Sequence, residues 1–318
     1  MAADYLHNHS DFKSLIQIIA EEKSIEPALV EKDYWIMHVL YGLKKQGFTF
    51  ELKGGTSLSK GFKIIERFSE DIDVHIEPPP GMNINQNPKN CSDTTIKCRR
   101  EFYDYLTGVI MIEGILSVKR DTEFDDTDCY RSGGIRLHYE SFFDRVEGLK
   151  EGLLLEAGFT TVSPNRNLTI DSWSYDRAAS TSGVNVIDNR AMDIACYLPG
   201  YTFVEKLQTI ATKYRNETTG GKGHTNFMRQ YYDVSCLLDN KEVQDFIATP
   251  AYAEHKEKHF PKADLHEPIA QNQAFMLSDE ETLQDFKRRY LSTSTLYYNG
   301  QPEFDSLIDN IGKYLDQL

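Results

Sequence analysis

The segment 48–76 constrains the fold of this chain more than any other stretch. It opens with FTFEL, which has the composition of a short strand and is ended by Gly54 and Gly55. Residues 56–66 place apolar side chains at helical spacing, and DIDVHI at 71–76 alternates polar and apolar residues as a half-buried strand does. We therefore predict a strand, a glycine turn, a helix over 56–66 and a second strand.

Two kinds of binding group sit within this segment. Asp71 and Asp73 are two residues apart on the second strand, so both side chains leave the same face. Neighbouring carboxylates repel unless a cation lies between them, and oxygen ligands suit Mg²⁺ or Mn²⁺. The glycine turn and a helix start at Thr56 or Ser57 offer backbone N–H groups to a phosphate. Lys60, one turn further on, either faces the same phosphates or is solvated.

Other chemistries find no matching motif in the sequence. GGTSLSKG is not a Walker A loop, because that motif places Lys and then Ser or Thr directly after its second glycine. The cysteines form no CxxC pair, so we predict neither a zinc site nor a disulfide framework. We treat His75 and His138 as ordinary strand residues. The five cysteines are Cys91, Cys98, Cys129, Cys196 and Cys236.

The rest of the chain divides into a strand-rich part and a helix-rich part. Helices are expected over about 10–46 and 94–113, and strands in ILSVKRDTEF, GIRLHYES and GLLLEAGF. We predict no firm element for 165–189, where periodicity is weak. From Phe203 onward the apolar spacing is helical.

This division predicts the domain organisation. A chain of 318 residues is long enough for one large domain or two ordinary ones. We expect an α+β domain with N-terminal helices over residues 1–198. A helical domain over 199–318 is expected to complete the active-site cleft.

Charge and hydropathy limit the partners of the chain. The formal net charge of −14 argues against non-specific binding to duplex DNA. The basic clusters at 97–100 and 119–120 are candidates for contact with an RNA backbone, as is the glycine-rich basic segment 213–229. No run of about 18 apolar residues predicts a membrane span, and the N-terminus has no secretory pattern. We expect a cytoplasmic protein.

The segment resembles the signature of the AbiEii-type nucleotidyltransferase toxins, within the DNA polymerase β-like nucleotidyltransferase superfamily. That signature reads GGT-x-L-x-K and then R-x-S-x-D-x-D. The matching residues are Gly54, Gly55, Thr56, Leu58, Lys60, Arg67, Ser69, Asp71 and Asp73. Two later motifs match as well: Glu205-Lys206-Leu207 at a helix start, and RQYYDVSCLL, which contains Asp233.

The resemblance implies a mixed nucleotidyltransferase-type sheet flanked by helices and followed by a mainly helical domain. It implies metal on Asp71 and Asp73 and catalytic roles for Asp71, Asp73, Lys206 and Asp233. The nucleoside triphosphate is expected to contact Gly54, Gly55, Thr56, Ser57, Lys60, Arg67 and Ser69. It also implies a third metal-binding carboxylate on a later strand. Glu156 in LLLEAGF is the first candidate, and Glu140, Asp125 and Asp126 are its rivals.

The resemblance further implies a toxin of a toxin–antitoxin or phage-defence system, neutralised by a cognate antitoxin that is often a DNA-binding repressor. The expected reaction is Mg²⁺-dependent transfer of a nucleotidyl group to an acceptor hydroxyl, for which the 3′ end of tRNA is one candidate. Two alternatives stay open. A kinase-like phosphotransferase uses the same kind of site, and a binding module keeps the fold without catalysis.

Overall fold

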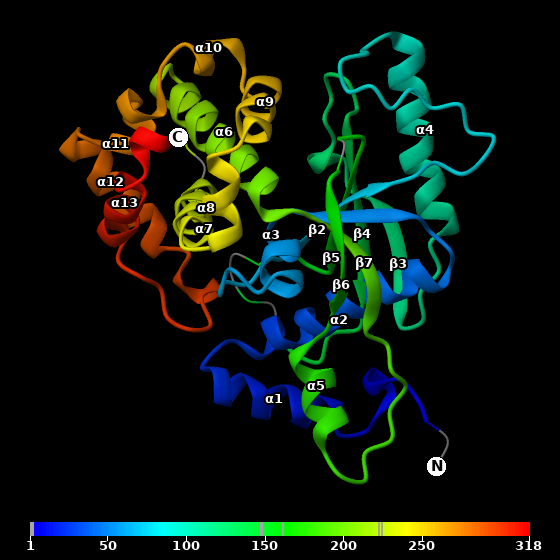
Figure 1. The fold of residues 1–318 in the computed structure, drawn as a ribbon. Coiled ribbons are helices and arrows are strands. Elements are labelled where there is room, and N and C mark those ends of the chain that lie inside the picture. The colour runs from blue at the N-terminus through cyan, green and yellow to red at the C-terminus, as the bar shows by residue number, and fades with distance from the viewer. Residues whose placement is uncertain (1–2, 145, 147–148, 161, 222, 224) are drawn as a thin grey trace. The chain divides into compact units, whose positions relative to one another are not determined.

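The chain forms two compact units, which the elements labelled in Figure 1 make up. The first comprises Met1–Gly61 and Phe68–Tyr197, and the second comprises Phe62–Arg67 and Leu198–Leu318. The computed structural model describes residues 3–144, 146, 149–160, 162–221, 223 and 225–318. The described residues include no helix long and apolar enough to cross a membrane.

The first unit is built on a mixed sheet. In the described part of the chain this sheet has seven strands in the order β3-β4-β5-β2-β1-β7-β6. Strand β2 pairs antiparallel with β1 and parallel with β5, while β1 runs parallel to β7. The strands are β1 Phe50–Lys53, β2 Asp71–Ile76, β3 Ile115–Arg120, β4 Ser132–Tyr139, β5 Leu153–Gly158, β6 Asn165–Ile170 and β7 Ala191–Tyr197.

Helices flank this sheet. The longest of them, α2, has Pro27 in its first turn, where a missing N–H costs no hydrogen bond. Most of α2 is buried, because it contacts α1, α5, β5 and β7. Its Trp35 stacks on Tyr139 of β4 with ring centroids 4.8 Å apart. The helices are α1 Phe12–Lys23, α2 Pro27–Lys45, α3 Gly54–Thr56, α4 Asp93–Val109 and α5 Trp173–Ser180.

The second unit is helical. Helix α6 contacts α7, α8 and α9, and an aromatic group that includes Phe227, Tyr231 and Phe286 fills part of its core. The helices are α6 Pro199–Thr218, α7 Arg229–Leu238, α8 Lys241–Ile247, α9 Pro250–His259, α10 Lys262–Leu265, α11 Gln273–Met276, α12 Glu280–Leu291 and α13 Phe304–Gly312.

The segment Phe62–Arg67 belongs to this second unit through hydrogen bonds. The Tyr298 hydroxyl donates to the Ile65 carbonyl at 3.2 Å, and the Glu66 N–H donates to the Tyr232 hydroxyl at 3.1 Å. These contacts explain why the helix predicted over 56–66 is much shorter. It starts at Gly54, continues as a π-helical turn Ser57–Gly61 and ends there.

The structure confirms an α+β fold with a mixed, helix-flanked sheet and a mainly helical C-terminal part. Strand β2 matches its predicted bounds. The region 165–189, where we predict no firm element, contains β6 and α5. Strand β7 follows, and the hydrophobic pattern does not single it out. Helix α1 has Asp11 at its N-cap, one residue after Ser10.

The cysteines also differ from expectation. Cys91 and Cys129 form a disulfide, so the prediction of no such framework is wrong for this pair. The two residues are 38 apart in sequence, and their Cα atoms lie 4.9 Å apart. They meet because the chain before α4 folds beside the connection from β3 to β4, which spacing alone does not reveal. Cys98, Cys196 and Cys236 are free.

Candidate active site

Three carboxylates meet on one face of the sheet in the first unit. Asp73 on β2 is the register partner of Glu156 on β5 and, on its other side, of Lys53 on β1. Asp71 precedes Asp73 by two positions, so its side chain leaves the same face. The structure thus brings together the aspartate pair and Glu156, the first candidate for the third carboxylate.

The surroundings of Glu156 in this carboxylate cluster disfavour its negative charge. Burial raises the pKa of Glu156 to about 7, and the negative charges of Asp73 and Asp71 add to that effect. Lys53 and Lys150 oppose it only in part. A cation placed among these oxygen atoms relieves the repulsion, so the donor set suits a hard divalent ion.

The glycine turn lies directly against this cluster. Gly54 has a φ of +71°, a backbone conformation that residues with a Cβ rarely adopt. A Cβ placed on Gly54 would also collide with the Asp73 carboxylate. Glycine is therefore required here twice, once by the backbone conformation and once by close packing on a candidate metal ligand.

The helix after the turn starts earlier than predicted. It begins at Gly54, so the N–H groups that lie outside its hydrogen-bond ladder belong to Gly54, Gly55 and Thr56. The Thr56 hydroxyl donates to the Asp71 carbonyl at 2.5 Å. Ser57 is fully buried, with its hydroxyl against the Cys196 thiol. The Thr56 and Ser57 hydroxyls therefore contact other parts of the fold. The groups that this turn can offer to a phosphate are its main-chain N–H groups.

Lys150 is a member of the site that the motifs do not indicate. Its ammonium group donates to both Asp71 oxygen atoms, at 2.9 and 2.7 Å. Its own main chain is held by two buried residues, since its N–H donates to Glu70 and its carbonyl accepts from Lys32. The position precedes β5 by only a few residues, but a lone lysine in a loop carries no sequence signal.

Lys60 makes a different contact from the one expected. Its ammonium group pairs with Asp33 of α2 at 2.6 Å and lies over the Trp173 ring. Asp33 is 1% exposed, and its other oxygen accepts the Trp173 N–H at 2.9 Å. Lys60 therefore ties the π-helical turn to α2 and α5, and its contact with a nucleotide stays a prediction.

The motif residues of the second unit form a separate buried cluster. The Arg67 guanidinium donates to both Asp233 oxygen atoms at 2.6 Å. The Lys206 ammonium donates to Asp233 Oδ2 at 2.6 Å and to Gln230 at 3.0 Å. Arg67 is 4% exposed and its guanidinium is paired with a carboxylate, so its contact with a nucleotide stays a prediction.

In this Arg67–Asp233–Lys206 cluster, the two cations favour the ionised form of the Asp233 carboxyl. Burial alone raises the pKa of Asp233, but Arg67 and Lys206 outweigh burial and lower that pKa to about 2. The cluster links the segment Phe62–Arg67, α6 and α7. The catalytic roles of Lys206 and Asp233 stay predictions.

The remaining predicted residues lie outside these clusters. Ser69 is half-buried in the segment that leads into β2. Among the rivals of Glu156, Asp125 is paired with Arg120 and Asp126 with Arg131, while Glu140 is exposed. None of these three shares the register of Asp73 and Glu156.

The basic clusters proposed for RNA contact also have structural partners. Arg99 is fully buried and donates to the carbonyls of Asn85, Asn87 and Cys129 at 2.6–3.1 Å. It thereby supports the connections on either side of α4. Arg120 pairs with Asp104 and Asp125. These two arginines therefore have structural partners, and contact of the basic clusters with RNA stays a prediction.

The match to a family model agrees with the motif assignment. The family model described as the nucleotidyl transferase AbiEii toxin of a type IV toxin–antitoxin system matches residues 38–310. Among solved structures, the chain is similar to an antigenic nucleotidyltransferase-like protein from Paracoccidioides brasiliensis. That alignment has 12% identity and a TM-score of 0.30, and covers 74% of this chain and 98% of the other. The search of curated proteins finds no match. Because the family model spans most of its length, the chain belongs to the AbiEii nucleotidyltransferase toxin family of type IV toxin–antitoxin systems.

Proposed function

We propose that this chain transfers a nucleotidyl group from a nucleoside triphosphate to an acceptor hydroxyl, with Mg²⁺ or Mn²⁺ as cofactor. The observation that carries this proposal is the placement of Asp71, Asp73 and Glu156 on one sheet face, with Gly54 packed against Asp73. The family assignment supports the reaction class. The cofactor, the nucleotide and the acceptor are parts of the proposal.

The three carboxylates are the groups that we propose hold the cofactor. They supply only hard oxygen atoms, which Mg²⁺ and Mn²⁺ prefer. The pKa of Glu156 is raised mainly by burial and further by the charges of Asp73 and Asp71, and a cation at this position favours the ionised carboxylate. When bound, the ion neutralises the charge that develops on the transferred phosphoryl oxygen atoms.

The glycine turn is proposed as the phosphate-binding element. The N–H groups of Gly54, Gly55 and Thr56 stand at a helix start, and the absence of a Cβ at Gly54 lets the main chain approach a ligand. Gly54 packs on Asp73, so a triphosphate bound at this turn lies beside the carboxylates.

The proposed reaction is a displacement at the α-phosphorus of the nucleotide. The acceptor oxygen forms the new bond to phosphorus, the bond to the β-phosphate breaks, and pyrophosphate leaves with the electron pair. The acceptor proton passes to a carboxylate, for which we propose Glu156. Lys150 holds the Asp71 carboxylate in place through two hydrogen bonds.

The proposed partners follow from the family. A type IV toxin implies a cognate antitoxin, and we propose that it is a DNA-binding repressor. We propose an RNA acceptor, the 3′ end of tRNA, although the net charge of −14 requires that any contact with RNA be local.

A labelling assay tests this function. The protein is incubated with Mg²⁺, total tRNA and each nucleoside triphosphate in turn, labelled on the α-phosphate. Wild type is compared with Asp71→Asn/Asp73→Asn. The control is Asp93→Asn/Glu101→Gln, which removes the same charge from two exposed positions of α4. We expect label in RNA with wild type and control, and none with the aspartate variant.

Other outcomes have distinct meanings. Label in protein replaces the RNA acceptor with a protein one. Incorporation from γ-labelled nucleotide alone identifies phosphoryl transfer and contradicts the nucleotidyl proposal. No incorporation from either label, together with no heat of nucleotide binding in calorimetry, favours the binding module.

A further inference from the structure

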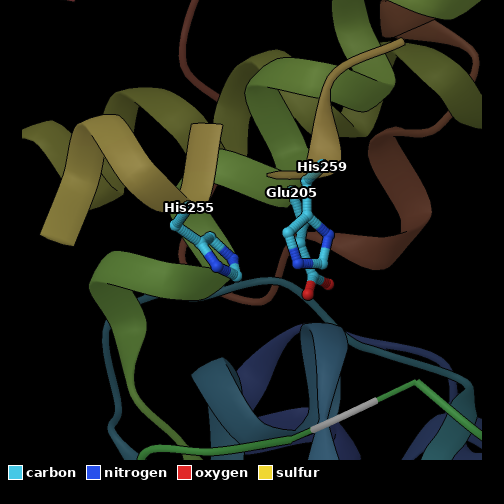
Figure 2. A group of neighbouring side chains, drawn as sticks. All are labelled: Glu205, His255 and His259. Carbon is cyan, nitrogen blue, oxygen red and sulfur yellow. The ribbon is translucent and has the colours of Figure 1, made fainter. Parts of the chain in front are cut away.

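A second group of potential metal ligands lies in the helical unit. His255 and His259 are four residues apart on α9, so their side chains leave the same face of that helix. Glu205 projects toward them from α6, as Figure 2 shows. One ligand atom from each of the three residues lies within 4.8 Å of the other two.

The surroundings of this Glu-His-His cluster suit metal binding. His255 is 8% exposed, and Glu205 and His259 are half-buried, so water competes less for the ligand atoms than at an open surface. The two imidazole rings have centroids 4.0 Å apart and are tilted by 40°.

We propose that Glu205, His255 and His259 bind one divalent metal ion of the Zn²⁺ class, which joins α6 to α9. Two imidazole nitrogens and one carboxylate oxygen form a common ligand set for Zn²⁺. Ligand bonds of about 2.0–2.2 Å in a tetrahedral shell place ligand atoms about 3.4 Å apart. Metal binding therefore requires the present separation of up to 4.8 Å to shorten.

This site uses other ligands than the carboxylate cluster proposed for the transfer reaction. Its imidazole ligands are softer than the carboxylates of the first unit, so the two sites select different ions. The site also adjoins the Arg67–Asp233–Lys206 cluster, because Glu205 is followed directly by Lys206, whose ammonium group contacts Asp233. An ion at Glu205 fixes the turn of α6 that presents Lys206. The competing explanation is a hydrogen-bonded Glu-His-His group that takes no ion.

Cobalt absorption distinguishes these explanations. The full chain carrying Asp71→Asn/Asp73→Asn is titrated with Co²⁺, so that the carboxylate cluster does not contribute. The variants Glu205→Gln and His259→Gln each remove one ligand from a half-buried position. The controls are Glu254→Gln and His266→Gln, which change the same residue types at exposed positions of the same unit.

We expect one Co²⁺ per chain, with the intense visible bands of tetrahedral coordination, in the parent chain and both controls. Loss of one ligand is expected to weaken binding by at least about ten-fold, since even indirect partners of a metal site contribute that much. Equal affinity in the ligand variants and controls overturns the proposal. So does thiolate-to-cobalt absorption, which places the ion on a cysteine.

A second readout does not depend on variants that fold. In the parent chain, a stoichiometric amount of Zn²⁺ is expected to raise the thermal midpoint of the helical unit, and a chelator is expected to reverse the rise. An unchanged midpoint, together with no Co²⁺ bands, means that the cluster is held by hydrogen bonds alone and overturns the proposal.

Discussion

At the scale of single residues, the site depends on close packing between Gly54 and Asp73. The turn and the strand come together because β1 and β2 pair with Lys53 opposite Asp73, so the residue after Lys53 lies beside that carboxylate. The register of β2 and β5 likewise places Glu156 opposite Asp73. One residue of slippage in either pair would move a carboxylate to the opposite face.

Replacement of Gly54 by alanine tests this packing. The added Cβ strains a backbone with positive φ and collides with Asp73, so we expect a destabilisation of about 1–3 kcal/mol and loss of transfer activity. Gly81→Ala is the control, because Gly81 also has positive φ but has open space around its Cβ position. Denaturant unfolding and label incorporation are measured for both. Equal activity in the two variants would show that the packing on Asp73 is irrelevant to function.

Glu156→Gln separates stability from function at the same cluster. Ionised Glu156 is disfavoured by burial and by both aspartates, so a neutral glutamine is expected to stabilise the metal-free protein by about 1–2 kcal/mol near neutral pH. The same change is expected to abolish transfer and to reduce stabilisation by Mg²⁺. Glu151→Gln, at a position with a 71% exposed side chain, is the control. A stabilised variant with full activity would remove Glu156 from the proposed mechanism.

At the scale of elements, buried ion pairs join segments that are far apart in sequence. The pair Lys60–Asp33 holds the π-helical turn to α2 in the first unit. In the second unit, Asp233 holds Arg67 and Lys206. Such pairs are not strong stabilisers overall, but removal of one partner leaves a charge buried without compensation.

The Lys60–Asp33 pair gives a prediction about the role of a motif lysine. Lys60→Ala is expected to destabilise the protein by about 3–5 kcal/mol, because Asp33 is almost fully buried. Lys60→Met/Asp33→Leu is expected to recover much of that loss, since neither charge remains. Lys97→Ala, at a 69% exposed position, is the control. If the double variant regains stability but not nucleotide affinity, Lys60 contacts the nucleotide as well.

The second cluster predicts a dependence of stability on pH. The pKa of Asp233 falls from 3.8 to about 2 on folding, so its stabilising contribution is complete above pH 3.8 and is lost as the pH falls toward 2. The contribution is on the order of 2 kcal/mol. The difference in unfolding free energy between wild type and Asp233→Asn is therefore expected to shrink between these pH values. Asp245→Asn, at a 64% exposed position, is the control and is expected to show a constant difference. A constant difference for Asp233→Asn as well would contradict the assignment.

At the scale of the whole molecule, local patterns predict the fold class and the core of the site. Strand β2, its aspartate pair and the glycine turn are encoded by neighbouring residues, and so are the motifs of α6 and α7. Strands β6 and β7 are missed because their alternation is weak. The shortened helix after Gly54 is missed because contacts with Tyr232 and Tyr298 override its periodicity.

The partners of charged residues are the part that the sequence does not predict. Lys150 reaches Asp71 across 79 positions, and Asp33 reaches Lys60 across 27. The Cys91–Cys129 disulfide also joins residues that are distant in sequence. The same is true of Glu205, which lies beside His255 and His259. The spacing of the two histidines is visible in the sequence, but the third ligand comes from another helix.

Pyrophosphate release, counted together with nucleotide incorporation, is the most direct test of the central claim. We expect one pyrophosphate released for each nucleotide incorporated, dependence on Mg²⁺ or Mn²⁺, and loss of both products in Asp71→Asn/Asp73→Asn. The Asp93→Asn/Glu101→Gln control should retain both. Release of inorganic phosphate in place of pyrophosphate, or full incorporation by the aspartate variant, would contradict nucleotidyl transfer at the carboxylate cluster.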